Sequence, residues 1–218
     1  MPPERSQTKA DQVHERLRAA ILSGSLPPGA RLNVDALSRD LGIGKVPLRE
    51  AVQRLAAHGL VTQPGPHSGA QVATLSLTEL RGLLVTHAAL EALSARLAAA
   101  TVADAELAAL QELHEQMRAG SGPADCLPGL SDRFHAAIAA ATGNAPLCEL
   151  LERTRLRLRH YRVAVRRTPP WPTVIAEHAS LLDALRRRDA PAAERAARDH
   201  AEWHLPADLD PALADLGR

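Results

Sequence analysis

The segment LGIGKVPLREAVQRLAAHGLV, residues 41–61, constrains the fold more than any other part of this sequence. Its apolar residues recur at helical spacing and predict one buried face: Leu48, Val52 and Leu55. Lys45 and Arg49 are four residues apart, so they share a different face near the start of the helix. Pro47 falls in the first turn, where a missing N–H costs little. The segment predicts a helix that packs on one side and presents cations on another.

Two helices precede this segment, and a hairpin follows it. The stretch TKADQVHERLRAAILSG predicts a helix that begins after a Thr8 cap and ends at Gly24. The stretch SLPPGARL that follows predicts a turn. A short helix then follows Asn33 and ends at Gly42. The stretches LVTQ and AQVAT predict two short strands joined by PGPHSG. Helix, helix, tight turn, helix and β-hairpin make a winged helix-turn-helix, which we place at residues 8–75.

This arrangement predicts contact with DNA. The exposed N-terminal side of the third helix can enter a major groove, where Arg49 can bind guanine or a phosphate. The first-turn N–H groups can also take a phosphate. Residues 1–75 hold nine Lys and Arg against six Asp and Glu, whereas the whole chain has a formal net charge of +1. A solvated helix with ordinary cations is the alternative for Lys45 and Arg49 alone, but the turn and the hairpin favour DNA binding.

The first 75 residues resemble the DNA-binding domain of GntR-family transcription regulators. That family usually opens its recognition helix with Ser-Arg-Thr-Pro, followed by Arg-Glu-Ala. Here Lys45 keeps the positive charge of the family's Arg but lacks the guanidinium group that forms two parallel hydrogen bonds. Gly44 and Val46 replace residues that carry a hydroxyl group. The resemblance implies the following DNA-binding residues: Gly44, Lys45, Val46, Pro47, Arg49, and in the wing His67 and Gly69.

Residues 76–206 read as helices alone, and we place a second domain there. The expected helices are 77–100, 103–119, 126–142, 145–167, 173–188 and 190–204, separated by stretches such as GSGP, TGNAP and TPPWP. Only 2% of the residues are aromatic, so a core of Ala, Leu and Val must form by close packing of helices. The fold class is therefore mainly α, a winged helix-turn-helix followed by an antiparallel helical bundle.

This second region resembles the all-helical effector domain, called FCD, of the FadR-type branch of the same family. The resemblance rests on HAALEALSARLAA, DRFHAAIAAATGN and EHASLLDALRRRDAPAAERAARDH, in that order. Six helices resemble the smaller variant found in vanillate-type regulators. The resemblance implies a homodimer that binds a small, often carboxylated metabolite.

Three histidines carry the chemistry of this region. His135, His178 and His200 lie on separate expected helices, and the resemblance implies that they hold a divalent metal ion such as zinc, nickel or manganese. The family places an Asp one turn before the first histidine, where this chain has Ser131. The chain has ten histidines, so three ordinary half-buried side chains are the alternative.

The effector pocket departs from the family at a second position. Relatives commonly carry an Arg four residues before the glutamate that matches Glu91, whereas this chain has His87. His87 and Ser131 are therefore candidate pocket residues. A packed helix histidine is an equally good interpretation of His87.

The sequence contains no nucleophile motif, phosphate loop or cofactor fingerprint, so we do not expect an enzyme. We also expect no stretch that is apolar and long enough to cross a membrane, and hence a cytoplasmic protein. The interpretation is a homodimeric repressor that binds an inverted-repeat operator in double-stranded DNA under control of a small molecule. Two alternatives remain open: a metal-responsive regulator without an organic effector, and a hydrolase or lyase with a histidine-bound metal.

Overall fold

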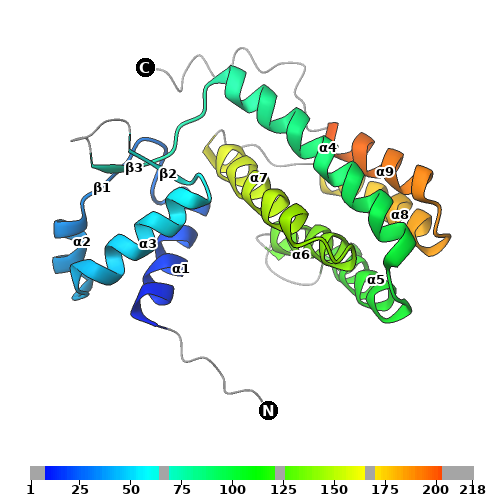
Figure 1. The fold of residues 1–218 in the computed structure, drawn as a ribbon, viewed down its shortest axis with the longest axis horizontal. Coiled ribbons are helices and arrows are strands. Elements are labelled where there is room, and N and C mark those ends of the chain that lie inside the picture. Colours follow the sequence, from blue (N-terminus) through cyan, green and yellow to red (C-terminus); the bar gives the residue numbers. More distant parts are fainter. Residues whose placement is uncertain (1–7, 64–68, 121–125, 165–169, 203–218) are drawn as a thin grey trace. The chain divides into compact units, whose positions relative to one another are not determined.

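The computed structural model describes residues 8–63, 69–120, 126–164 and 170–202 (Figure 1). The chain divides into two compact units. The first contains residues up to Ser76 together with Leu156–Arg167, and the second contains Leu77–Arg155 and the chain from Thr168 onward. The domain limits 8–75 and 76–206 stay predictions.

The first unit has the expected winged helix-turn-helix. Its helices are α1 (Lys9–Leu22), α2 (Val34–Leu41) and α3 (Lys45–Ala57). Its strands are β1 (Arg31–Leu32), β2 (Val61–Thr62) and β3 (Ala70–Val72), in the sheet order β1-β3-β2. The hairpin strands β2 and β3 confirm the prediction. Strand β1 lies in the stretch that the sequence predicts as a turn, and it pairs antiparallel with β3 through Arg31 opposite Gln71.

Local capping explains where these helices begin and end. The Thr8 hydroxyl accepts from the Asp11 N–H at 3.1 Å, and the Asp11 carboxylate accepts from the Thr8 N–H at 3.0 Å. Asn33 caps α2 by accepting from the N–H groups of the two residues at its second and third helical positions. Gly42 ends α2 with a φ of 63°, a conformation that glycine adopts without steric cost. The chain can therefore turn into α3 within two residues.

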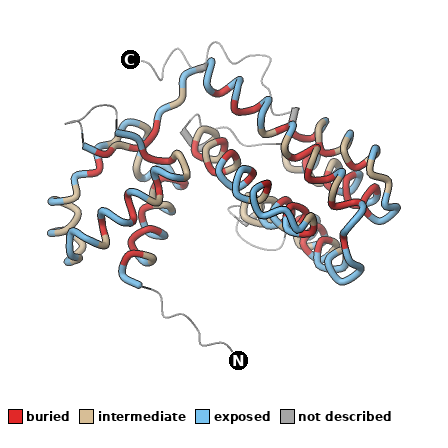
Figure 2. The backbone as a smooth tube through the Cα atoms, in the orientation of Figure 1, coloured by how far each residue is buried: buried red, intermediate tan, exposed pale blue. Residues whose placement is uncertain are grey.

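One continuous core joins the three helices to the sheet. Figure 2 shows buried positions alternating with exposed ones along α3, as an amphipathic helix requires. The side chains that the sequence predicts to be buried in α3 are 0% to 6% exposed: Leu48, Val52 and Leu55. Outside this core, Arg54 of α3 binds Asp11 of α1 at 2.6 Å.

The described part of the second unit contains helices joined by short turns, and no strand. The helices that follow residue 76 match the six predicted ones to within a few residues: α4 (Leu77–Thr101), α5 (Asp104–Ala119), α6 (Cys126–Ala141), α7 (Ala145–Ala164, in the second unit up to Arg155), α8 (Trp171–Arg186) and α9 (Ala190–Glu202). Helix α4 packs most extensively against α9, and Figure 1 shows the two side by side. Helices α5, α6 and α8 complete the bundle around the same core.

Small side chains let these helices approach closely. Ala95, Ala98 and Ala99 of α4 are 0% to 1% exposed and belong to the main core with Phe134 of α6. By length and composition alone, residues 78–101 of α4 would pass for a membrane span, contrary to the expectation that no stretch qualifies. Half of an 18-residue apolar window within that stretch is buried inside the protein. Helix α4 is therefore the core helix of the bundle.

Candidate functional site

The N-terminus of α3 is exposed, as a recognition helix requires. Gly44 caps α3 without a side-chain hydrogen bond, which follows from the loss of a hydroxyl at that position. Val46 is 75% exposed, and Lys45 and Arg49 are also exposed. Pro47 is half-buried in the first turn. The polar and apolar side chains at this end of the helix are thus available to a partner.

Lys45 has a partner within the protein. Its Nζ lies 2.7 Å from Oδ1 of Asp35, in the first turn of α2. The ammonium lowers the pKa of Asp35 through this hydrogen bond and through its charge, and Arg49 contributes a smaller lowering. The sequence suggests Lys45 as a simple phosphate-binding cation and gives Asp35 no role. The structure brings an acidic group to the same surface.

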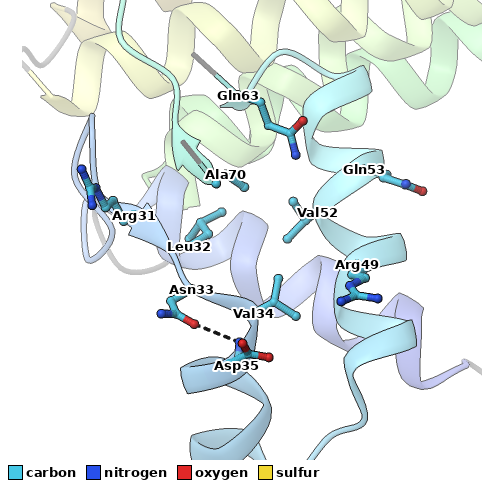
Figure 3. A pocket seen from close by; sticks show the side chains of 11 residues that line it. Arg31, Leu32, Asn33, Val34, Asp35, Arg49, Val52, Gln53, Gln63 and Ala70 are labelled. Carbon is cyan, nitrogen blue, oxygen red and sulfur yellow. Dashed lines mark hydrogen bonds between the residues drawn. The ribbon is translucent and has the colours of Figure 1, made fainter. Parts of the chain in front are cut away.

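A hollow of about 510 Å³ opens beside α3, between that helix and the sheet (Figure 3). Arg49 and Gln53 line it from α3, and Arg31 lines it from β1. Its floor is apolar, and Gly69, which is exposed, also lines it. His67 lies outside the described residues. A surface that combines guanidinium and amide groups over an apolar floor suits the edge of a nucleic-acid duplex.

Three imidazoles converge in the second unit. Nε2 of His135 on α6 lies 3.1 Å from Nε2 of His178 on α8 and 3.2 Å from Nε2 of His200 on α9. All three potential ligand atoms lie within 4.8 Å of one another, and each side chain is buried. Two nitrogen ligands of a tetrahedral zinc ion are roughly 3.3 Å apart, so the spacing suits a divalent metal.

Carboxylates fix the tautomers of two of these histidines. Nδ1 of His135 lies 3.2 Å from Oε2 of Glu91, and Nδ1 of His200 lies 2.7 Å from Oε2 of Glu177. A carboxylate only accepts hydrogen bonds, so each Nδ1 must donate, which in the neutral ring leaves a lone pair on each Nε2. Two lone pairs then face each other across 3.2 Å. A cation between them relieves this repulsion, so the residues present fit a metal ion.

Burial favours the neutral form of His178 and His200, which is the form that binds metal. Desolvation lowers the pKa of His178, and the neighbouring histidines lower it further. Desolvation also lowers the pKa of His200, against the opposing effect of Glu177. The ring of Phe134 stacks on His178 with centroids 4.6 Å apart. The centre is therefore enclosed on one side by an apolar wall.

The two candidate pocket residues, Ser131 and His87, are related to the three-imidazole cluster in different ways. Ser131 is half-buried on α6, one turn before His135. His87 lies on α4, where its Nδ1 is 2.8 Å from the Thr154 hydroxyl and its Nε2 is 3.6 Å from Oε1 of Glu91. The structure therefore connects His87 to the carboxylate behind His135, and the three-imidazole cluster does not include it.

The sequence alone indicates no role in the metal centre for Glu91, Glu177 or Arg155. Glu177 directly precedes His178, but it serves His200 on the next helix. Glu91 follows His87 by one helical turn, a spacing that suggests an interacting pair. Arg155 on α7 binds Glu91 at 3.3 Å, a pairing across 64 residues that no local pattern signals.

Comparison with known proteins places this geometry in a family. Residues 9–66 match the bacterial regulatory proteins of the gntR family, and residues 83–202, more than half of the chain, match the FCD domain. The chain is 28% identical over 206 residues to a probable D-xylose utilization operon transcriptional repressor of Paenarthrobacter nicotinovorans, covering 92% of this chain and 88% of that protein. It is 29% identical over 201 residues to the transcriptional repressor GlaR of Escherichia coli, covering 87% and 91%.

A solved structure shows the same fold. Escherichia coli McbR/YncC superposes with a TM-score of 0.76 at 25% identity, covering 91% of this chain and 95% of that one. The winged helix-turn-helix, the helical bundle and both family matches agree in order and extent. The chain belongs to the GntR family of transcription regulators, in the branch that carries an FCD domain.

Proposed function

We propose that this regulator is a repressor whose operator binding is controlled by a small organic acid at a metal centre in the FCD domain. The observation that carries the proposal is the convergence of three buried Nε2 atoms in the unit that follows a winged helix-turn-helix. The sign of regulation rests on two relatives named as repressors.

The proposed DNA interface is the N-terminal end of α3 with the tip of the hairpin. Arg49 reads a base or binds a phosphate, Lys45 binds a phosphate, and Val46 contacts base edges. Gly44 and Pro47 let the backbone N–H groups of the first turn approach the duplex. In the wing, His67 and Gly69 contact the adjacent groove.

The proposed cofactor is one divalent ion of zinc, nickel or manganese, held by His135, His178 and His200. Such an ion supplies a Lewis-acidic position at which a carboxylate can bind. Three neutral imidazoles leave the ion with its full positive charge, so an anionic effector is attracted to it. Ser131 lies one turn from His135 and can donate a hydrogen bond to the same ligand.

The proposed assembly is a homodimer in the cytoplasm, bound to an inverted-repeat operator. Two-fold symmetry in the protein requires a matching symmetry in the DNA half-sites. Effector binding shifts the population of dimers toward a state whose two recognition helices no longer match successive major grooves. A regulator that responds to the metal ion alone is the second candidate, because the donor set contains three imidazoles and no carboxylate.

The test uses duplex DNA selected by the full-length protein from a random library. We expect an inverted repeat, a dimer by light scattering, and weaker DNA binding when the zinc-loaded protein meets members of a panel of mono- and dicarboxylates. Arg49→Ala should cost about 1–3 kcal/mol of binding free energy per subunit if Arg49 reads a base. A selected sequence without symmetry would contradict the dimeric arrangement. Release of DNA by zinc without any carboxylate would favour the second candidate.

A further inference from the structure

A buried carboxylate contacts Nδ1 of His135, the ring nitrogen that does not face the other two imidazoles. Glu91 is 3% exposed and lies on α4, the core helix of the bundle. Its Oε1 is 3.3 Å from Nη2 of Arg155 and 3.6 Å from Nε2 of His87, and its Oε2 is 3.2 Å from Nδ1 of His135. A buried charge is tolerated only with such partners. Glu91 is therefore held rigidly while it accepts from His135.

A second carboxylate stands behind His200. Glu177 of α8 approaches Nδ1 of His200 to 2.7 Å, the shortest of the contacts between a carboxylate and these imidazoles. Its side chain is 23% exposed, so it is wetter than Glu91. The two glutamates come from different helices and serve different histidines. Each one sets the tautomer and the ring orientation of the histidine that it contacts.

The third imidazole lacks this support. Nδ1 of His178 is buried and has no hydrogen-bond partner among the residues that the structure describes. The ring of His178 stacks on Phe134, with the ring centroids 4.6 Å apart. His135 and His200 therefore each contact a carboxylate through Nδ1, whereas His178 stacks on an aromatic ring instead.

We propose that Glu91 and Glu177 are positioning residues that set the metal affinity of this chain, by making His135 and His200 stronger ligands than His178 and by supplying the negative charge that Ser131 does not. This inference rests on the proposed metal centre. A neutral set of three imidazoles holds a divalent ion more weakly than a set that includes an anion. Two carboxylates on the far side of the rings restore negative charge without occupying a coordination position, which leaves room for an effector.

The experiment measures the zinc dissociation constant of the full-length protein by competition with a chromophoric chelator. Glu91→Gln and Glu177→Gln keep a hydrogen-bond acceptor but remove the charge. We expect each variant to bind zinc about 10- to 100-fold more weakly than wild type. Glu194→Gln is the matched control, because Glu194 lies on α9 and forms its ion pairs with Arg96 and Arg198. We expect it to bind zinc as wild type does.

A second readout separates positioning from folding. Cobalt substituted for zinc reports ligand geometry through its visible absorption, so both glutamine variants should shift that spectrum and Glu194→Gln should not. Glu91→Gln leaves Arg155 without its buried partner and can unfold the bundle, whereas Glu177 is partly exposed and tests the same claim in a folded protein. Zinc affinity and cobalt spectrum equal to wild type in Glu177→Gln would overturn the inference. A wild-type protein that binds no zinc would overturn the proposed metal centre and this inference with it.

Discussion

Nζ of Lys45 lies 2.7 Å from Oδ1 of Asp35, so the first turns of α3 and α2 are joined by an ion pair on the surface proposed to meet DNA. Both side chains are more than half exposed. Such an exposed pair contributes little to folding. Its larger consequence is electrostatic, because it places a negative charge beside a cation that would otherwise attract phosphate.

Asp35→Asn should therefore strengthen DNA binding. The change removes the charge that competes with phosphate for Lys45, while asparagine keeps a similar shape. We expect tighter binding to selected and to random duplexes alike, together with a steeper decrease in affinity as salt rises. Fluorescence anisotropy at several salt concentrations measures both quantities.

Lys45→Ala supplies the complementary control. It should weaken binding to all sequences and reduce the salt slope by about one. In the Lys45→Ala background, Asp35→Asn should have a smaller effect than in wild type, because the partner is gone. Equal effects in the two backgrounds would show that Asp35 acts independently of Lys45.

Val46 should detect a thymine methyl group. It is 75% exposed at the end of α3 proposed to enter the groove, and an apolar side chain there can contact the 5-methyl of thymine. Replacing thymine by deoxyuridine, one symmetric pair of positions at a time, should reduce wild-type affinity at one pair. Val46→Ala should bind the thymine and uracil duplexes equally well.

A protein that binds its selected duplex but tolerates every uracil substitution would contradict this role for Val46. Val46→Thr is the matched control, since threonine keeps a methyl group in nearly the same place. It should retain part of the discrimination that Val46→Ala loses.

Asp11 should make the stability of the winged helix-turn-helix depend on acid pH. Hydrogen bonds from Arg54 and Thr8 lower the pKa of Asp11 from 3.8 to about 2. The native state then binds fewer protons than the unfolded state between these values, so the stabilisation is complete above 3.8 and is lost as the pH falls through about 2.

The measurement is the difference in thermal midpoint between wild type and Asp11→Asn. We expect wild type to be more stable at neutral pH and the difference to shrink steadily below pH 3.8. Arg54→Gln, which removes the other partner, should show the same trend. A difference that does not change with pH would mean that the hydrogen bonds of the Asp11 side chain, and not its charge, provide the stabilisation.

Phe134 should be a main support of the helical bundle. It is the one Phe in the sequence, it is 0% exposed, and it stacks on His178. Phe134→Ala leaves a cavity in the core and should lower the free energy of unfolding by about 3–5 kcal/mol. Calorimetry should show this loss of stability in the unfolding transition of the helical bundle. A loss below about 1 kcal/mol would mean that the surrounding helices collapse into the space.

Local patterns in the sequence predict most of the fold. Gly42 and Asn33 mark the ends of α2, and Leu48, Val52 and Leu55 define the buried face of α3, because capping and helical periodicity act over a few residues. Strand β1 is missed because it has two residues and exists only through pairing with β3, which is distant in sequence. Pairing of that kind leaves no local signal.

The candidate site is predictable only in part, for the same reason. Family resemblance and helix order select His135, His178 and His200, and the structure brings their Nε2 atoms together. The supporting carboxylates depend on how α4 packs against α6 and how α8 packs against α9, so Glu91 and Glu177 could not be assigned from spacing. The pairing of Lys45 with Asp35 depends likewise on the packing of two helices.

His135, His178 and His200 are proposed to bind a divalent metal ion. The most direct measurement is elemental analysis of full-length protein purified without an affinity tag or chelator, compared with His178→Ala purified in the same way. We predict about one zinc, nickel or manganese ion per wild-type chain, easily removed by chelator, and none in the variant. Wild-type protein without stoichiometric metal, whose thermal midpoint is unchanged by all three ions, would contradict it.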